Sequence, residues 1–201
     1  MDMLNTPDYY NLMFSFIEKM SGIKISEAEK RSAVEIFKPV KLAKKEFFLR
    51  EGEIPDRLGF NVSGALRCYY IDRKGNDITK FFSFEGSVCS YAGLLLKKES
   101  KYYIEALEDC VLMVADYDSF EKMIEDSSLW LKLVKKIQDQ ILIYKEERES
   151  SFLMETATER YNNFKKNYPE VEERINQSYI ASYLGISAVS LSRIRNKLKN
   201  S

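Results

Sequence analysis

The residues whose types most clearly suggest a binding function are the basic side chains near the end of the chain. The segment from Arg174 to Ser201 contains five basic residues and no acidic one, although the formal net charge of the whole chain is zero. Lysine and arginine neutralise phosphate groups, and arginine also forms paired hydrogen bonds with the edge of guanine. A cationic end on a neutral chain therefore favours double-stranded DNA as a partner. The alternative interpretation is an ordinary helical hairpin with a solvated basic face.

Two short helices around a glycine are expected to hold these side chains in place. Asn176 and Ser187 suit the N-cap positions of the two helices, and Gly185 suits the left-handed residue that ends the first. The second helix carries an apolar row made of Leu191, Ile194 and Leu198. This pattern predicts a helix-turn-helix, whose second helix lies in the major groove. The residues predicted to contact DNA are Gln177, Ser178, Val189, Ser190, Ser192, Arg193, Asn196, Lys197 and Lys199.

The residue types that the chain lacks narrow its function. It has no histidine, which excludes His-based triads and His-ligated haem, zinc and non-haem iron sites. Its cysteines, Cys68, Cys89 and Cys110, are far apart, as expected of buried thiols in a reducing cytoplasm. No stretch approaches the roughly 18 apolar residues of a membrane span, and the first residues do not resemble a signal peptide. We therefore expect a cytoplasmic protein that is not an enzyme and holds no metal or cofactor.

Helices are expected on both sides of a strand-rich middle region. Residues 8–37 read as two helices, with Asp8 and Ser26 as N-caps and Gly22 between them. A further helix is expected to begin at Asp116 or Asp118. Between these helices, from about residue 40 to 116, short apolar runs alternate with turn signals, which favours a β-sandwich or barrel. The turn Asp72–Asn76 predicts a hairpin, and a short helix is expected over 91–97.

A long helix over residues 127–152 is predicted to form a dimer. Its seam residues follow one another at alternating spacings of four and three, which is a heptad pattern. They are Trp130, Val134, Ile137, Ile141, Tyr144 and Arg148. A second stripe suits packing against the strand-rich region and consists of Leu129, Leu133, Ile137 and Tyr144. The alternative is a single amphipathic helix packed on one domain. A further helix over 154–167 follows, and Pro169 ends it.

This order of elements resembles that of the Crp/Fnr family of bacterial transcription regulators. The motifs that carry the resemblance are Phe48–Glu53, Val62–Arg67, Phe84-Glu85-Gly86, Ala157–Tyr161 and Tyr179–Ser187, of which the last two are similar to a branch found in Bacteroidetes. The resemblance implies an α+β fold with three parts. Residues 1–126 would form a β-roll like that of cyclic-nucleotide-binding domains, residues 127–152 the dimerisation helix, and residues 153–201 the helix-turn-helix domain, without the β wing that the family usually has.

The departures from the family pattern concern the effector. In members that bind cyclic nucleotides, a glutamate after the cassette glycine holds the ribose and an arginine near the cassette's end pairs with the phosphate. Ser87 stands at the first position here, and Ser100 or Lys101 at the second. We therefore expect no tight binding of cAMP or cGMP, because a buried phosphate needs charged donors. The N-terminal cysteine cluster of the iron–sulfur branch is also missing.

Two interpretations of the β-roll remain open. It either encloses an unknown small-molecule effector or is a filled core, since barrels of this size can be either. The expected effector pocket consists of Phe84, Gly86, Ser87, Val88, Ser100, Lys101 and Tyr102.

The resemblance also assigns roles in the second helix. Many relatives carry an acidic residue where this chain has Val189, which can instead touch a thymine methyl group. Arg193 matches a residue that reaches guanine, while Lys197 and Lys199 are expected to contact phosphates. The expected function is that of a homodimeric transcription regulator that reads a pseudo-palindromic site and works with RNA polymerase. The alternatives are a ligand-binding β-roll module whose C-terminal helices contact proteins, and, more remotely, a cupin-like metal enzyme.

Overall fold

The structure is a computed structural model, and it describes residues 8–90, 94–95, 97–169 and 171–199. The chain divides into two compact units. Unit 1 comprises Met1–Arg67 and Phe82–Asp139, and unit 2 comprises Cys68–Phe81 and Gln140–Ser201. The fold is α+β, as predicted.

Unit 1 begins with two capped helices. Helix α1 (Tyr9–Ser21) starts at Asp8, whose carboxylate accepts from the Asn11 N–H, and ends at Gly22, which has a φ of 69°. Helix α2 (Glu27–Ile36) starts at Ser26, whose hydroxyl accepts from the Glu29 N–H. The predicted caps are therefore confirmed, because each depends on contacts within four residues of chain.

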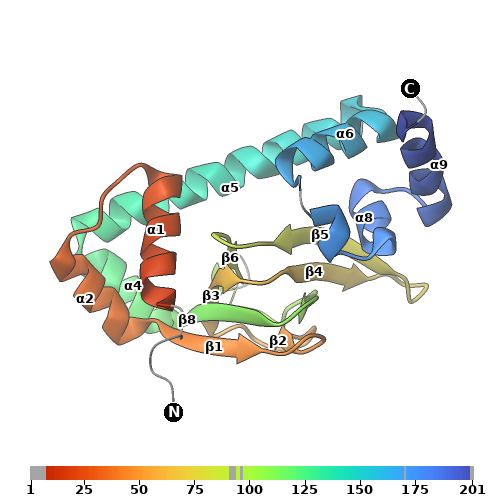
Figure 1. Cartoon of the computed structure of the whole chain (residues 1–201). Helices are drawn as coiled ribbons and strands as arrows, with labels where there is room; N and C mark the ends of the chain where they lie inside the picture. Colours follow the sequence, from red (N-terminus) through yellow and green to blue (C-terminus); the bar gives the residue numbers. More distant parts are fainter. Residues whose placement is uncertain (1–7, 91–93, 96, 170, 200–201) are drawn as a thin grey trace, which may run out of the picture. The chain divides into compact units, whose positions relative to one another are not determined.

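The strands form two four-stranded sheets (Figure 1). The first has the order β1-β8-β3-β6 and contains β1 (Lys38–Leu42), β3 (Arg57–Ser63), β6 (Val88–Cys89) and β8 (Cys110–Asp116). The second has the order β2-β7-β4-β5 and contains β2 (Phe47–Leu49), β4 (Leu66–Ile71), β5 (Asp77–Ser83) and β7 (Tyr103–Ala106). Every pair with a described register is antiparallel. The predicted hairpin turn at Asp72–Asn76 joins β4 and β5, and the Asp72 N–H donates to the Asn76 carbonyl at 2.9 Å.

A fully buried asparagine organises the turn that follows β3. The Asn61 amide nitrogen donates to the carbonyls of Gly64 and Ser83, at 2.9 and 3.0 Å, and its oxygen accepts from the Ser63 N–H. The register of β3 against β8 shifts at this point. Gly64 has a φ of 94°, and a Cβ atom there would lie 2.6 Å from the Asp109 carbonyl oxygen. The Val-Ser-Gly motif of the sequence therefore corresponds to a turn that only glycine fits.

Helices cover the first sheet and close the core of unit 1 (Figure 1). Helix α4 (Tyr117–Asp126) begins at Asp116, which accepts from the Ser119 N–H at 2.9 Å, so Asp116 rather than Asp118 is the cap. Helix α5 (Ser128–Met154) follows directly. The expected helix over 91–97 cannot be assessed as a whole, because 91–93 and 96 lie outside the described residues.

Two residues predicted for the dimer seam belong to this core instead. Trp130 is 2% exposed and Val134 is 8% exposed, and both pack among the buried side chains of α1, α2 and α4 together with Leu133. The heptad pattern did not predict this burial, because an apolar stripe does not specify whether its own domain or a partner covers it. At its start, α5 is a core helix of unit 1.

Within the residues that the structure describes, unit 2 contains the rest of α5 and four shorter helices. They are α6 (Ala157–Asn167), α7 (Val171–Arg174), α8 (Gln177–Leu184) and α9 (Ala188–Lys199). Helix α6 begins with a capping box, in which Thr156 and Glu159 each satisfy a backbone N–H of the other. Tyr161 and Phe164 are its buried side chains. All three cysteines lie in strands, are buried, and form no disulfide with one another.

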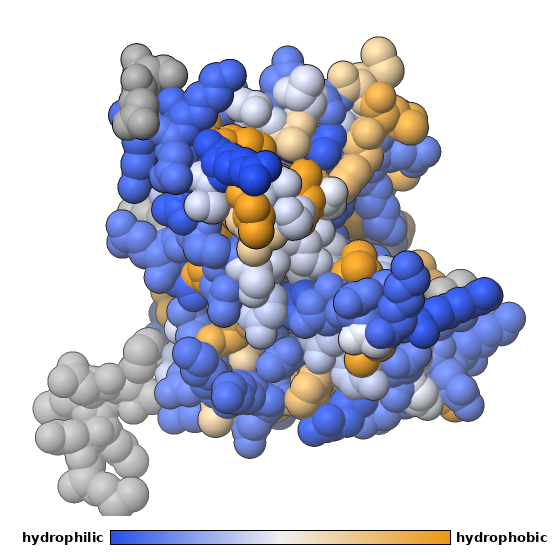
Figure 2. Space-filling view, turned by 90° about the vertical axis from the view of Figure 1, so that its right-hand side faces the viewer, coloured by the Kyte–Doolittle hydropathy of each residue, from blue (hydrophilic) through white to orange (hydrophobic). Residues whose placement is uncertain are grey.

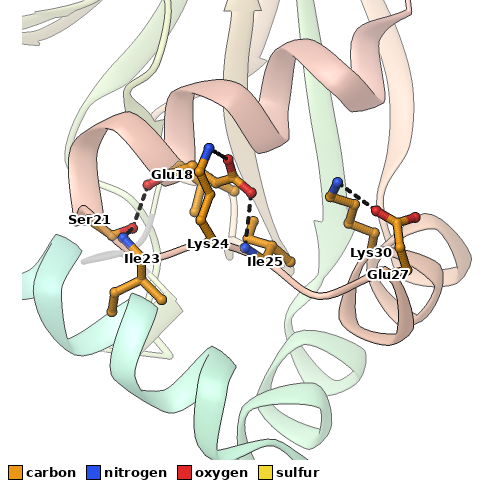
Figure 3. A network of polar contacts seen from close by, with 8 residues as sticks. Glu18, Ser21, Ile23, Lys24, Ile25, Glu27 and Lys30 are labelled. Carbon is orange, nitrogen blue, oxygen red and sulfur yellow. Dashed lines mark hydrogen bonds and ion pairs between the residues drawn. The ribbon is translucent and has the colours of Figure 1, made fainter.

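A small polar network holds the loop between α1 and α2 (Figure 3). The Glu18 carboxylate accepts from Lys24 Nζ at 2.6 Å and from the Ile25 N–H at 2.9 Å. The hydrogen bond from Lys24, and then that from Ile25, lowers the pKa of Glu18 below its ordinary value of 4.5. Ser21 closes the same turn by accepting from the Ile23 N–H at 3.1 Å.

This network predicts that unit 1 loses stability in acid. A carboxyl whose pKa is lower in the folded state contributes stability above its unfolded pKa and loses it as the pH falls through the folded pKa. Glu18→Gln should therefore lower the free energy of unfolding at pH 7, by about 1 kcal/mol. The difference from the unaltered protein should shrink below about pH 4. Urea unfolding across this pH range measures both effects.

The matched control is Glu27→Gln, which removes an exposed ion pair with Lys30. It should have a smaller effect, because exposed pairs contribute little. A Glu18→Gln difference that is the same at pH 3 and pH 7 would contradict the interpretation.

Candidate nucleic-acid interface

Helices α8 and α9 are joined by a short turn that glycine makes possible. The Asn176 side chain caps α8 by accepting from the Ser178 N–H at 2.9 Å. Gly185 has a φ of 70°, and its N–H donates to the carbonyls of Ala181 and Ser182. The Ile186 N–H also donates to the Ala181 carbonyl, at 3.0 Å. The predicted cap and turn residues thus occupy the predicted positions.

Helix α9 buries its apolar row and exposes its polar row. Leu191 is 1% exposed, whereas Ile194 and Leu198 are half-buried. On the other side, Val189 is 62% exposed, and Arg193 and Asn196 follow it at spacings of four and three and are also exposed. Exposed neighbours on the same helix are Ser192, Lys197 and Lys199. This row can meet the base edges and phosphates of a nucleic acid.

Three other predicted contact residues differ in accessibility. Ser178 is exposed, whereas Gln177 and Ser190 are half-buried. The Ser190 hydroxyl is hydrogen-bonded to the Ser187 hydroxyl at 2.9 Å. Figure 2 shows hydrophilic residues over most of the surface in view, with hydrophobic residues gathered in places.

One basic residue of α9, Arg195, contacts neighbouring helices and does not belong to the exposed row. Arg195 Nε lies 3.8 Å from Glu172 Oε1 of α7, and the Tyr161 hydroxyl of α6 donates to the same oxygen. Burial, and then the hydrogen bond with Glu172, raises the pKa of Tyr161 to about 12. Arg195 therefore joins α9 to α6 and α7. The local charge count could not distinguish it from Arg193.

The C-terminal end of α8 is held by two arginines. Arg148 Nη2 of α5 donates to the Tyr183 carbonyl at 2.9 Å, and Arg160 Nε of α6 donates to the Leu184 carbonyl at 3.1 Å. The Arg148 guanidinium lies 3.9 Å from the centre of the Tyr183 ring and 4.8 Å from that of Phe152. Arg160 lies 5.0 Å from the centre of the same Phe152 ring. We call Arg148, Phe152 and Arg160 the arginine clamp.

Tyr144 and Arg148 were predicted for the dimer seam, but both contact α8 of their own chain. The Tyr144 hydroxyl is 3.0 Å from that of Tyr183, and burial raises the pKa of Tyr144 strongly. Ile137 and Ile141, the other two seam residues, are half-buried. The motif that contains Arg160 was recognised in the sequence, but its contact was not, because the carbonyl partner lies 24 residues away.

Helix α8 also contacts the β4–β5 hairpin. The Ser182 hydroxyl accepts from the Thr79 N–H at 2.9 Å and donates to the Asp77 carbonyl at 3.1 Å. Both backbone groups belong to β5, which stands at the end of its sheet order. One side chain thus satisfies two edge groups of a strand that would otherwise need water or another partner.

The two serine hydroxyls of the expected effector pocket form hydrogen bonds within the chain. The Ser87 hydroxyl donates to the Phe84 carbonyl at 2.5 Å and lies 2.7 Å from the Ser83 hydroxyl. The Ser100 hydroxyl donates to the Tyr102 carbonyl and accepts from the Tyr102 N–H. Gly86 faces the Phe16 ring of α1, Val88 is half-buried, and Lys101 is exposed.

A cavity of about 230 Å³ lies beside this region. Its lining residues are Phe48, Leu49, Glu53, Ile54, Pro55, Asp56, Arg57 and Ser90. Apart from Ser90, they come from β2, β3 and the segment between them. The volume is below the roughly 300–1,000 Å³ typical of ligand pockets.

The described residues offer little for metal or thiol chemistry. Among them, no group of three or more carboxylates and thiols is arranged to hold a metal ion. Burial, and then the charge of Glu108, raises the pKa of the Cys110 thiol to about 12, so this cysteine stays protonated. None of the helices in the described part of the chain is long and apolar enough to cross a membrane.

Comparisons with known proteins identify the fold. Residues 39–127 match the family model of the cyclic nucleotide-binding domain. Search of the curated proteins found no match. Among solved structures, FixK2 from Bradyrhizobium japonicum is 20% identical, with a TM-score of 0.72 over 82% of this chain and 85% of that one. A CooA mutant from Carboxydothermus hydrogenoformans is 16% identical, with a TM-score of 0.69 over 92% of this chain and 84% of that one.

A third similar structure is that of the c-di-GMP responsive global regulator CLP from Xanthomonas campestris. It is 14% identical, with a TM-score of 0.68 over 87% of this chain and 92% of that one. At these identities the likeness establishes the fold, and it extends over most of the length of each relative.

The Ser182 contact generates a direct prediction. Ser182→Ala removes the acceptor of the Thr79 N–H, so this amide should exchange with deuterium faster, by roughly fivefold, as expected for a lost hydrogen bond of about 1 kcal/mol. Amide exchange followed by NMR measures it. Ser178→Ala is the control, because that hydroxyl lies on the same helix and donates to Asn176 instead. Unchanged Thr79 exchange in Ser182→Ala would show that the contact does not persist in solution.

Proposed function

We propose that this chain is a DNA-binding transcription regulator of the Crp/Fnr type, which acts in the cytoplasm as a homodimer. The observation that carries the proposal is the exposed row of Val189, Arg193 and Asn196 on α9. It stands in a chain whose residues 39–127 match the cyclic nucleotide-binding domain and whose fold is that of FixK2, CooA and CLP. In this proposal α8 and α9 are a helix-turn-helix, and α9 is the recognition helix.

The side chains of α9 have the chemistry that base reading requires. Arg193 would donate two hydrogen bonds to a guanine, and such a pair gives about 1–3 kcal/mol of discrimination. Val189 accepts no hydrogen bond, so its contact would be a thymine methyl group. Asn196, one turn further on, would reach a base or a phosphate. Lys197 and Lys199 would neutralise phosphates and add affinity without specificity.

The N-terminal end of α8 suits phosphate contacts. Its first backbone N–H groups point out of the helix, and the helix dipole favours an anion there. Ser178 is exposed at this end, with Gln177 beside it. These contacts would orient the recognition helix without reading sequence.

A homodimer would account for the apolar side chains that α5 leaves exposed. Leu142 is 67% exposed and Ile143 is 56% exposed, in the middle of a 27-residue helix. Ile137 and Ile141 are half-buried beside them. The proposed interface thus keeps Ile137 and Ile141 of the predicted seam and adds Leu142 and Ile143. Two recognition helices would then meet half-sites about one helical turn apart, roughly 34–36 Å.

The β-roll would act as a scaffold or respond to an effector other than a cyclic nucleotide. The hydroxyls of Ser87 and Ser100 are hydrogen-bonded within the chain, and the only charged side chain at the positions of the family's phosphate partner is the exposed Lys101. An effector would act by binding the DNA-competent arrangement more tightly than the other. The alternative function is that of a ligand-binding module whose C-terminal helices contact proteins.

Selection of bound DNA from a random pool tests the proposed function. We expect a two-fold consensus with a guanine in each half-site, because each Arg193 would read one. Arg193→Ala, selected in parallel, should lose that guanine preference, with an affinity loss of about 1–3 kcal/mol per half-site on the original site.

Lys199→Ala is the matched control for this selection. It should weaken all sequences about equally and reduce the salt slope by about one. If the unaltered protein enriches no sequence, or if Arg193→Ala together with Lys197→Ala leaves DNA binding unchanged, the alternative function replaces the proposed one.

Titration calorimetry with cAMP and cGMP tests the altered cassette. We expect no binding with a micromolar dissociation constant, which would correspond to a binding free energy of about −8 kcal/mol. The physical reason is that a cyclic phosphate would be desolvated without an arginine to pair with it. If heat of binding appears, the same titration of Lys101→Ala shows whether this lysine takes the place of the family's phosphate-binding arginine. Micromolar or tighter binding would refute the expectation.

A further inference from the structure

We infer that Arg148 and Arg160 are positioning residues that fix the direction of the recognition helix relative to the C-terminal part of α5. The inference rests on the proposed function, because it assigns to the arginine clamp a role in the geometry of a DNA reader. It concerns residues that do not themselves touch DNA in that proposal, and all of them lie in unit 2.

The clamp supplies hydrogen bonds that the end of α8 lacks. The last carbonyls of a helix have no partner within the helix and carry the negative end of its dipole. The N–H of Gly185 donates to the carbonyls of Ala181 and Ser182. The carbonyls of Tyr183 and Leu184 therefore need donors from outside α8. They accept from Arg148 and Arg160, respectively. Two guanidinium groups from two other helices thus complete the C-terminus of α8.

Stacking on aromatic rings also restricts the orientation of the two guanidinium groups that join α8 to α5 and α6. Arg148 stacks on Tyr183 of α8 and lies near Phe152 of its own helix, and Arg160 of α6 lies over the same Phe152 ring. A planar guanidinium held by both a ring and a carbonyl has little rotational freedom, which an ammonium group would retain. The clamp therefore fixes an angle as well as a contact.

The turn between α8 and α9 is packed directly on the clamp. A Cβ atom at Gly185 would lie 2.7 Å from Phe152 Cε1, so the turn backbone rests against this ring. Arg160 Nη1 also donates to the Glu155 carbonyl at 2.6 Å, which ties it to the connection between α5 and α6. The end of α5, the start of α6 and the turn before α9 consequently converge on one aromatic ring.

The consequence in a dimer is a defined spacing between the two recognition helices. If α5 pairs with its counterpart, a rigid joint at its end sets where each α9 points. With a flexible joint, each α9 would still bind its half-site. The dimer would then also accept half-sites at other spacings. The clamp therefore determines spacing selectivity and not the reading of bases.

A measurement without DNA tests the joint itself. Spin labels attached to Lys145→Cys on α5 and Lys197→Cys on α9 report the distance between these helices, and the native cysteines are buried. We expect a narrow distance distribution in the otherwise unaltered chain and a distribution at least twofold broader in Arg148→Lys and in Arg160→Lys. Lys136→Ala, on the exposed side of α5, is the control and should leave it narrow. Equal widths in all four proteins would overturn the inference, even if the protein binds no DNA.

Binding to operators of altered spacing tests the consequence. With the selected site, insertion of two base pairs at its centre should weaken the unaltered protein at least tenfold. In Arg148→Lys and Arg160→Lys this penalty should fall to about threefold or less, while affinity for a single half-site stays the same. Arg193→Ala should instead weaken half-sites and full sites alike.

The two ideas fail in different ways. A wild-type chain that selects no two-fold site refutes the proposed function, whereas the distance distributions still decide the clamp. Clamp variants that keep the full spacing penalty, or that weaken half-sites as much as full sites, refute the clamp alone. Circular dichroism melts of each variant identify those that are merely unfolded.

Discussion

The unsatisfied carbonyls at the end of α8 are the constraint around which unit 2 is arranged. A helix of eight residues exposes half of its carbonyls at its C-terminus, and burial of that end requires donors from elsewhere. Arg148 and Arg160 supply them from α5 and α6. Phe152 gives both arginines an apolar surface, and the backbone of Gly185, whose φ of 70° favours glycine, packs against the same ring. The exposed row of α9 therefore owes its direction to residues outside the basic segment that contains it.

The β-roll shows the same dependence on internal hydrogen bonding. Asn61 satisfies carbonyls at Gly64 and Ser83, and the Ser87 and Ser100 hydroxyls satisfy groups of their own loops. Hydroxyls that are hydrogen-bonded in this way are less available to a bound anion. Ser182 then connects β5 to α8 with a pair of hydrogen bonds. This pair of hydrogen bonds links the β4–β5 hairpin directly to α8.

Sequence reasoning succeeded wherever the deciding contacts were local, and it failed where they were distant. The caps Asp8, Ser26 and Asn176 and the glycines at 22 and 185 were all placed correctly. Part of the heptad in α5 makes contacts within the chain, because Trp130 enters the core of unit 1 and Tyr144 contacts Tyr183. A dimer contact at Ile137 and Ile141 stays a prediction. Arg195 adds to the positive charge of the C-terminal segment, but the sequence does not reveal that it lies beside Glu172.

The amino-acid sequence alone determined where helices begin and end, where the chain turns, and which face of α9 is polar. Caps, turns and periodicity arise from interactions within a few residues, so they can be read without coordinates. Only the tertiary structure decided which arginines are structural and which are exposed. Arg148, Arg160, Arg193 and Arg195 are chemically identical, and their roles differ through partners that lie 35 and 24 residues away for the first two. The free energy of a guanidinium depends on what surrounds it after folding, and no local pattern encodes that.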